Sequence, residues 1–424
     1  MANPTYFTFS EHSLQNEDDE NRLTTILAEN ISKYKFSNDN PEYLGLNDKL
    51  EAHYYIGMRW IKWNGNDKEH KGVIWVKPKN SDIPFEKLLL ACLTHPIVSN
   101  HLNECYKVNI DEPSIVVPHN FSDYLTPLLI ADFLMKARNI VKRGLKKNYV
   151  SIRETLNNKT KGKISVNTTI KNQLKKGIIT QTDCVYQIHT VDCLENRILK
   201  TALLQSQKYI YQFLKTNNQL RELLLFNLTA FEHVSTVSVN RIDLSEMHHN
   251  IFYKDYKGAL HLAKLILDRI GYSLNADITK KAKTIPPFYI NMPELFERYC
   301  EVLLRKKYPD TLAGYHQTGY SETRLGRSRL RPDFIIPSEN RIVDSKYKYW
   351  IEGSNDIHGL MQLSLYSRHD KALQFLNNES KNPILQIIYP SKDGDYEIDF
   401  SKSMNQSIEE YEEIYKYPVM INEI

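Results

Sequence analysis

Two carboxylates and an amine stand close together in the last third of the chain: Asp333, Asp344 and Lys346. Asp344 and Lys346 lie two positions apart on an apolar run. Because strand side chains alternate between faces, both should project from one face. Hard divalent cations prefer carboxylate oxygens, and phosphodiester hydrolysis needs a metal ion to polarise the phosphate and activate water. The spacing therefore predicts a hydrolytic metal site, with the aspartates as ligands and the lysine beside the attacking water.

A surface salt bridge on a two-stranded hairpin would explain the same three residues without any chemistry. The runs that carry them, around Phe334–Ile336 and Val343, are apolar enough to read as buried strands. The residues between, Pro-Ser-Glu-Asn at 337–340, are a typical hairpin loop. Because unpaired charges are costly in buried strands, this placement favours a catalytic site over a solvated salt bridge.

A helix is predicted directly upstream of this hairpin. Asn291 is a natural N-cap, Pro293 suits the first turn, and Glu294 falls at the capping-box position. Glu297 follows beside the apolar stripe of this helix, where it is a candidate for a further metal ligand. The plain alternative for Glu297 is a solvated helix glutamate.

A second helix is predicted downstream, over residues 356–369. It carries Gln362 and Tyr366 four positions apart and therefore on one face. Gln362 can hold a phosphate or a catalytic side chain, and Tyr366 can stack or donate a hydrogen bond, although a polar pair at this spacing is otherwise ordinary. The succession of helix, two strands with Asp…Asp-x-Lys, and helix with Gln-x-x-x-Tyr favours a nuclease over coincidence.

This succession is the arrangement of PD-(D/E)xK nucleases, and its motifs resemble the McrC family, the nuclease subunits of McrBC-type modification-dependent restriction systems. The most specific motifs are Pro-Pro-Phe-Tyr at 286–289, Leu-Phe-Glu at 295–297, Arg-Pro-Asp at 331–333, Val-Asp-Ser-Lys-Tyr-Lys at 343–348 and Gln-x-x-x-Tyr at 362–366. The resemblance continues upstream through Arg-Gly-Leu at 143–145, Lys-Gly-Lys-Ile at 161–164 and Glu-Asn-Arg-Ile-Leu-Lys at 195–200. It covers the chain from about residue 125 to about residue 390.

The resemblance implies that Asp333, Asp344 and Lys346 form the active site, with Mg²⁺ as the cofactor and Mn²⁺ able to substitute. Two departures are mild: Ser345 stands where the family often has Ala, and Lys161 replaces Arg. The expected substrate is modified double-stranded DNA. The resemblance also implies that the N-terminal part docks in a hexameric McrB-like AAA+ GTPase and stimulates its hydrolysis. The chain itself has no Gly-x-x-x-x-Gly-Lys-Ser/Thr motif, so we expect it to bind no nucleoside triphosphate alone.

Two basic stretches are candidates for contacting DNA. The cluster that leads into Asp333 contains Arg324, Arg327, Arg329 and Arg331, with Lys348 just beyond the hairpin. Arginine forks bind phosphate through two parallel hydrogen bonds, whereas solvent-exposed loop arginines are the plain alternative. Residues 136–176 are also rich in Lys and Arg, which suits either phosphates or an acidic protein surface.

A length of 424 residues suggests two or three domains. We expect a multidomain protein of mixed α+β and α/β class, with an N-terminal partner-docking or recognition domain over 1–125. A basic linker and helical middle region should follow over 126–280, and the PD-(D/E)xK, restriction-endonuclease-like domain over 281–424. Within this frame, the pattern predicts a helix over 121–147 and short strands over 148–190.

Composition excludes several other classes. The five cysteines are far apart and lack zinc spacing, which indicates a reducing cytoplasm. No apolar run approaches the roughly 20 residues of a membrane span, so no membrane partner is expected. Two rival functions remain: a RecB-like repair nuclease, since the same core serves both, and a non-catalytic subunit that binds DNA or docks in a ring. The complete Asp/Asp/Lys set argues against the second.

Overall fold

The computed structural model describes residues 5–14, 23–27, 34–65, 68–79, 85–109, 112–117, 125–213, 218–238, 254–273, 284–314, 331–348, 357–376, 382–408, 411 and 413–420. The chain forms two compact units of mixed α/β structure. The first consists of Met1–Ser122 together with Ala282–Ile424, and the second is Asp123–Lys281. The boundaries expected near residues 125 and 280 lie close to these divisions, although the first and last expected domains share one unit. The three-domain division stays a prediction.

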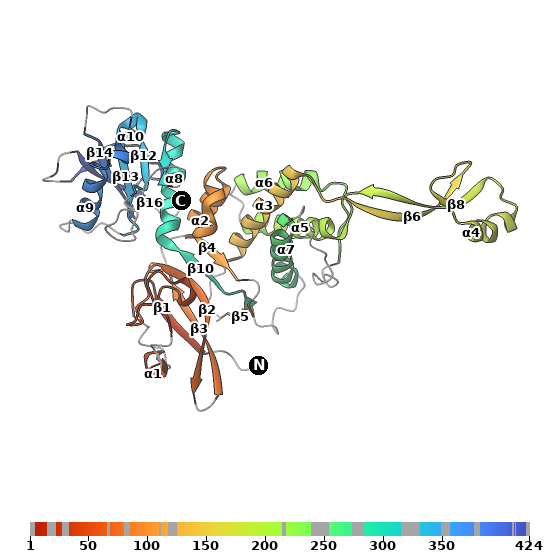
Figure 1. Cartoon of the computed structure of the whole chain (residues 1–424), viewed down its shortest axis with the longest axis horizontal. Helices are drawn as coiled ribbons and strands as arrows, with labels where there is room; N and C mark the ends of the chain where they lie inside the picture. Colours follow the sequence, from red (N-terminus) through yellow and green to blue (C-terminus); the bar gives the residue numbers. More distant parts are fainter. Residues whose placement is uncertain are drawn as a thin grey trace. The chain divides into compact units, whose positions relative to one another are not determined.

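A five-stranded sheet joins the two ends of the chain within the first unit. Its order is β1 (Thr5–Ser10), β3 (Lys68–Lys77), β2 (Tyr55–Gly65), β10 (Phe288–Asn291) and β4 (Tyr106–Val108) (Figure 1). β2 and β3 form a hairpin and pair antiparallel. β10 comes from far along the chain and pairs with both β2 and β4. The sheet therefore ties the N-terminal segment to the segment that carries the candidate site.

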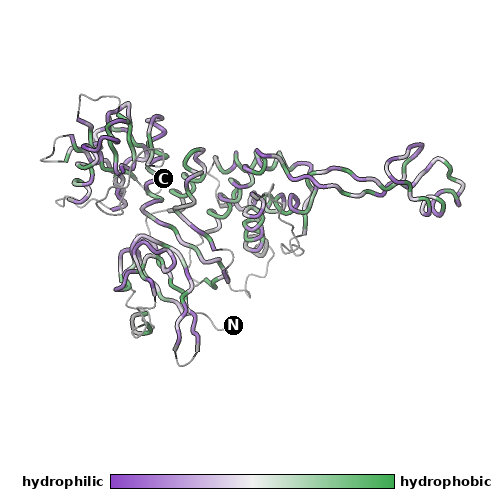
Figure 2. Tube along the Cα trace, in the orientation of Figure 1, coloured by the Kyte–Doolittle hydropathy of each residue, from purple (hydrophilic) through white to green (hydrophobic). Residues whose placement is uncertain are grey.

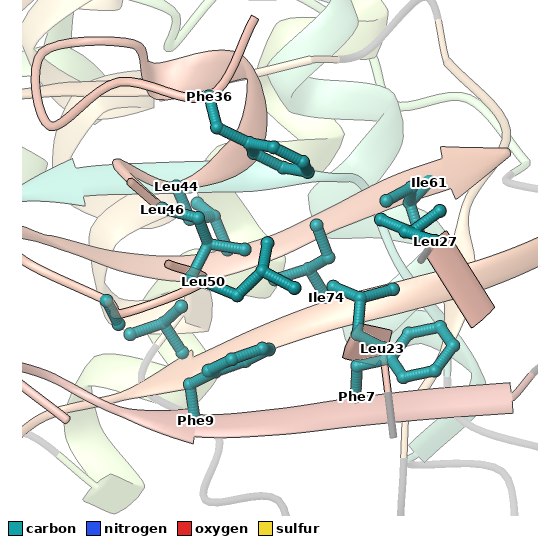
Figure 3. Packing of buried hydrophobic residues seen from close by; sticks show 12 residues of the cluster. Phe7, Phe9, Leu23, Leu27, Phe36, Leu44, Leu46, Leu50, Ile61 and Ile74 are labelled. Atoms are coloured by element: carbon teal, nitrogen blue, oxygen red, sulfur yellow. The ribbon is translucent and has the colours of Figure 1, made fainter. Parts of the chain in front are cut away.

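Apolar side chains from this sheet and the surrounding loops form one buried cluster (Figure 3). Phe7 and Phe9 of β1 lie in it with Ile74 of β3 and with Leu23 of α1 (Leu23–Leu27). Each such side chain contributes about 1.5–3 kcal/mol when fully removed from water. The remaining elements of this segment are η2 (Pro41–Tyr43), α2 (Phe85–Thr94), η3 (Val98–Glu104) and β5 (Ile115–Val116), which pairs with β9 (Thr284–Ile285).

A second, six-stranded sheet carries the predicted Asp…Asp-x-Lys hairpin. Its order is β11 (Leu312–Ala313), β12 (Phe334–Ile336), β13 (Arg341–Ser345), β14 (Ile384–Ser391), β16 (Ile414–Met420) and β15 (Gln406–Ser407). β13, β14 and β16 are parallel, and the outer pairs are antiparallel. The predicted hairpin loop is confirmed as η8 (Pro337–Glu339), closed by Asn340 in the left-handed region at φ 47°. The helices of this part are α8 (Met292–Lys307), α9 (Ile357–Tyr366) and α10 (Asp370–Gln374).

The second unit combines helices with a long hairpin. α3 (Leu125–Arg143), α5 (Leu194–Phe213), α6 (Asn218–Ala230) and α7 (Lys254–Ser273) pack together. β6 (Asn148–Asn157) and β8 (Gln181–Thr190) pair along their whole length and extend away from these helices (Figure 1). The far end of this hairpin holds β7 (Lys163–Ile164), α4 (Val166–Asn172) and η4 (Leu174–Lys176). We call residues 148–190 the arm.

The arm differs from the short strands expected there, because β6 and β8 have 10 residues each. Hydrophilic and hydrophobic residues both occur along it (Figure 2). The helix expected to reach residue 147 ends instead at Arg143, where Gly144 adopts φ 97° and turns the chain. Among the helices that the structure describes, none is both long enough and apolar enough to cross a bilayer.

Candidate active site

α8 positions Glu297, and its start follows from local sequence signals. The side chain of Asn291 accepts a hydrogen bond from the backbone N–H of Glu294 at 3.4 Å, and Pro293 occupies the first turn, as predicted. β10 runs directly into this helix. Leu295 and Phe296 are buried, so the helix presents its apolar face to the protein and places the next residue, Glu297, at the edge of that face.

The two aspartates come from neighbouring strands of the six-stranded sheet. Asp333 immediately precedes β12, and Asp344 lies within β13, where it is 1% exposed. Phe334 pairs with Val343, so the register places Asp333 and Asp344 opposite each other at the next position. The carboxylate of Asp333 accepts hydrogen bonds from both the backbone N–H and the hydroxyl of Ser345, each at 2.7 Å. The local pairing thus brings both carboxylates to the same end of the hairpin.

Lys346 follows β13 and lies on the same side as Asp344, as the alternation of strand side chains predicts. Its ammonium is 2.6 Å from the Asp344 carboxylate. It also donates a hydrogen bond of 2.8 Å to the side-chain oxygen of Gln362 on α9. The side-chain amide of Gln362 in turn donates to the hydroxyl of Tyr366, which is 1% exposed. A continuous series of ion-pair and hydrogen-bond contacts therefore runs from Asp344 through Lys346 and Gln362 to Tyr366.

A buried ion network on α8 contacts Glu297. Arg298 donates hydrogen bonds of 2.8 Å to Glu294 and to Glu297 and one of 3.1 Å to Glu301. Arg305 donates one of 2.8 Å to Glu301. The sequence prediction missed this network, although its signal was available: acids and arginines spaced three and four apart lie on one helix face.

Burial and mutual repulsion both disfavour the charged forms of these carboxylates. Burial, with a further contribution from the charges of Asp333 and Asp344, raises the pKa of Glu297 well above its ordinary value, while Arg298 opposes the shift. Burial also raises the pKa of Asp333, against the hydrogen bonds from Ser345 and the charge of Lys346. Glu297, Asp333 and Asp344 therefore lie near enough for their charges to interact. Such a cluster favours a nearby cation.

The chemistry of these donors fits Mg²⁺, which prefers carboxylate oxygens. Their present contacts are of another kind, because Glu297 contacts Arg298 and Asp333 contacts Ser345. Accordingly, within the described part of the chain no three His, Cys, Asp or Glu side chains form a group that could hold a metal ion as they stand. The role of Asp333, Asp344 and Glu297 as a set of metal ligands therefore stays a prediction.

The residues predicted to contact DNA are only partly described. Arg331 is half-buried beside Gly314, and Lys348 is exposed, two residues beyond the catalytic lysine candidate. Arg324, Arg327 and Arg329 lie outside the described residues. No structural statement about these three follows, and their contact with DNA stays a prediction.

Two solved assemblies resemble the chain at low identity. The first is the refined half-complex from the tetradecameric assembly of Thermococcus gammatolerans McrB AAA+ hexamers with bound McrC, with 17% identity, a TM-score of 0.39, and coverage of 99% of this chain and 95% of that chain. The second is the cryo-EM structure of the Thermococcus gammatolerans McrBC complex, with 16% identity, a TM-score of 0.32, and coverage of 71% and 87%. No curated protein matches the chain.

Family membership rests on a sequence model that covers most of the chain. The model described as "McrBC 5-methylcytosine restriction system component" matches residues 50–367. This range includes β2 and β10 of the five-stranded sheet, the whole second unit, and all six predicted catalytic residues. The chain therefore belongs to the McrBC 5-methylcytosine restriction system component family.

Proposed function

We propose that this chain is the Mg²⁺-dependent DNA endonuclease subunit of a McrBC-type restriction complex, built on a PD-(D/E)xK core. The observation that carries the proposal is the pairing of buried Asp344 with Lys346 at the end of the inner strand β13, with the charges of Glu297 and Asp333 near enough to interact. A solvated salt bridge would not account for this arrangement, because burying several like charges is costly unless the site uses them. The expected substrate is DNA that contains modified cytosine, in keeping with the family.

The balance of charge around the site supports a divalent cation. Five carboxylates are joined here by ion pairs or mutual repulsion: Glu294, Glu297, Glu301, Asp333 and Asp344. They face three cationic side chains, those of Arg298, Arg305 and Lys346. The carboxylates therefore outnumber the cationic side chains that contact them, which favours binding of a cation.

Each predicted residue then has a role that follows from its contacts. Bound Mg²⁺ would be held by Asp333, Asp344 and Glu297, and it would polarise the scissile phosphate and acidify water. The ammonium of Lys346, held between Asp344 and Gln362, orients the attacking water and stabilises negative charge that develops on the phosphate. Gln362 and Tyr366 fix the lysine from α9. Arg331 and Lys348 are the candidates for holding the phosphate backbone of the DNA.

Substitution of the paired residues tests the proposal. Asp344→Ala and Lys346→Ala should each lower cleavage of methylated plasmid by at least about 100-fold, because each removes charge stabilisation at the reacting phosphate. The assay contains Mg²⁺, GTP and the AAA+ partner. Asp48→Ala and Lys49→Ala change an exposed aspartate and an exposed lysine in the N-terminal segment and serve as matched controls.

Full cleavage by either site variant would contradict the catalytic assignment of Asp344 and Lys346. It would support the alternative that this chain is a non-catalytic subunit. Cleavage that needs neither GTP nor the partner, and that starts from DNA ends, would instead indicate the RecB-like repair nuclease.

The proposed partner is a McrB-type AAA+ GTPase, and the arm is a candidate for contacting it. The far end of the arm exposes apolar side chains, with Val166 59% exposed and Ile179 82% exposed. Exposed apolar residues on a protruding element mark an interaction site, and they suit a protein better than a phosphate backbone. The root of the arm is held in place by buried Asn196, whose side chain donates hydrogen bonds to the backbone oxygens of Lys146 and Val191. Docking through residues 1–125 stays the alternative.

A further inference from the structure

Two buried side chains, those of Asn196 and Tyr256, tie both ends of the arm to the helices of the second unit. Asn196 lies in the first turn of α5 and is 0% exposed, and Tyr256 of α7 is 5% exposed. The side-chain amide of Asn196 donates hydrogen bonds of 2.8 Å to the backbone oxygen of Lys146, where the chain enters the arm, and of 2.6 Å to that of Val191, where it leaves. One amide group therefore joins the two strands at their base.

The hydroxyl of Tyr256 completes this set of contacts. It donates a hydrogen bond of 2.8 Å to the side-chain oxygen of Asn196 and accepts one of 2.7 Å from the backbone N–H of Lys146. Both the N–H and the C=O of Lys146 are thus bonded to side chains from α5 and α7. We call Lys146, Val191, Asn196 and Tyr256 the root clamp. Because a satisfied buried polar network specifies one arrangement of its members, the root clamp fixes the backbone at Lys146.

Gly144 lies two residues before Lys146 and is suited to act as a hinge. It follows the last residue of α3, Arg143, and adopts φ 97°, which glycine reaches without steric cost. A Cβ atom at Gly144 would have no neighbour within 4 Å, so the chain has open space there. The backbone can therefore turn at Gly144 unless Lys146 is held.

The other strand of the arm provides a fixed pivot. β8 ends at Thr190 and α5 begins at Leu194, so the connection is short. Within it, Asp192 accepts hydrogen bonds from the side chain of Arg197 and from the backbone N–H and hydroxyl of Ser235. A short connection of this kind fixes a point but not a direction. The direction of the arm therefore depends on whether the entering strand is held at Lys146.

The length of the arm amplifies any rotation at its root. β6 and β8 have 10 residues each, and at about 3.3 Å per residue they place the far end of the arm about 33 Å from its root. A rotation of about 10° would displace that end by about 6 Å, whereas apolar side chains lose contact beyond about 4.5 Å. Exposed Val166 and Ile179 at the far end can therefore meet a partner surface reproducibly only when the direction of the arm is fixed.

We propose that Asn196 and Tyr256 are positioning residues that hold a hinge at Gly144 closed and so keep the arm in the direction that binds the AAA+ partner. This inference rests on the proposed function, because it assumes that the far end of the arm contacts that partner. Neither residue touches the partner in this scheme, and both act through the backbone of Lys146.

The test is Tyr256→Phe in the full chain, which removes only the bridging hydroxyl. Spin labels at Lys175→Cys in the arm and Glu222→Cys on α6 report the direction of the arm in the isolated chain, since both positions are exposed and the five native cysteines are buried. We expect one narrow distance peak in the wild type. In Tyr256→Phe, the ratio of molecules inside this peak to molecules outside it should fall at least about tenfold, because two hydrogen bonds are lost. Hydrogen exchange at the Lys146 amide should accelerate by a similar factor.

Stimulation of the GTPase activity of the partner tests the functional part. The chain concentration for half-maximal stimulation should rise by the same factor by which the fraction of molecules in the peak falls, because only that fraction is competent to bind. Stimulation at saturating chain concentration should stay within about twofold of the wild type. Damage to the arm itself would not produce this correspondence between the two measurements.

Tyr211→Phe is the matched control, because it removes an exposed hydroxyl from α5 outside the root clamp, and it should change none of these quantities. Asn196→Ala should act in the same direction as Tyr256→Phe and more strongly, since it releases the backbone oxygens of both strands. An unchanged distance peak in Tyr256→Phe, or a broadened peak with unchanged half-maximal stimulation, would overturn the inference. Stimulation by the wild-type arm that survives Val166→Asp with Ile179→Asp would instead remove the arm contact from the proposed function.

Discussion

Lys346 is held by two acceptors that come from different elements. Asp344 belongs to the same strand and lies 2.6 Å from its ammonium, and Gln362 belongs to a helix far along the chain and lies 2.8 Å from it. In the proposed mechanism, these two contacts hold the ammonium beside the Asp344 carboxylate, where it orients the water that attacks the phosphate.

A different buried acid, Glu11, gives a prediction about pH and stability. Its side chain is 1% exposed at the end of β1 and accepts hydrogen bonds from the backbone N–H of Lys79 at 3.3 Å and the hydroxyl of Tyr347 at 3.4 Å. Burial raises the pKa of Glu11 to about 8, against those hydrogen bonds. Between its ordinary pKa and about 8, the folded state therefore holds a proton that the unfolded state has lost.

The stabilisation from this proton is fully present below the ordinary glutamate pKa and is lost as the pH rises to about 8. Glu11→Gln cannot ionise, so the free energy of unfolding of the wild type should fall relative to Glu11→Gln from pH 5 to pH 8, by on the order of a few kcal/mol. Thermal melts at several pH values measure this difference, with exposed Glu42→Gln as the control. A difference that does not change with pH would show that Glu11 ionises normally.

At the scale of elements, the start of α8 depends on how β10 enters the five-stranded sheet. Gly57 of β2 pairs with Tyr289 of β10 and adopts φ 144°. A Cβ atom at Gly57 would lie 2.2 Å from the backbone oxygen of Phe288. Any side chain there would therefore displace β10, which leads directly into the helix that carries Glu297.

Gly57→Ala should lower the free energy of unfolding by about 2–4 kcal/mol, from the strained backbone and the clash together. Chemical denaturation measures this loss. Gly258 in α7 is the matched control, because a Cβ there would meet only the end of the Lys136 side chain, at 3.4 Å. Gly258→Ala should raise the free energy of unfolding by about 0.5–1 kcal/mol. Equal and small effects at the two positions would contradict the close approach of β2 and β10.

At the scale of the whole molecule, cleavage and activation should be separable. The candidate catalytic residues lie in the first unit and the arm lies in the second. If the arm contacts the AAA+ partner, Val166→Asp with Ile179→Asp should lower the stimulation of partner GTPase activity by about tenfold, because it places charge in an apolar contact. Asp344→Ala should leave that stimulation intact.

Leu225→Asp provides the control for this experiment, since Leu225 is 51% exposed on α6, outside the arm. The measurement is the GTP hydrolysis rate with each variant at equal concentration. Unchanged stimulation by the double arm variant would indicate that the chain docks through residues 1–125, as the sequence resemblance implies.

Local signals in the sequence were sufficient for much of the candidate site. The Asn291 cap, the loop at 337–340 and the alternation between Asp344 and Lys346 each depend on residues within a few positions of one another, and the structure confirms all three. The length of the strands in the arm was underestimated, because strand length depends on cross-strand pairing. β6 and β8 stabilise each other over 10 residues each, although neither alone has a strong apolar pattern.

The sequence by itself determined which residue types could do the chemistry and which of them share a strand or a helix face, because those relations follow from periods of 2 and about 3.6 residues. Only the tertiary structure decided that Glu297, Asp333 and Asp344 lie near enough to repel one another and that Gln362 reaches Lys346. It also decided that Arg298 is buried, although the spacing of its acidic partners on the same helix was visible in the sequence. Burial and contacts between distant segments set the electrostatics, and neither can be derived from spacing along the chain.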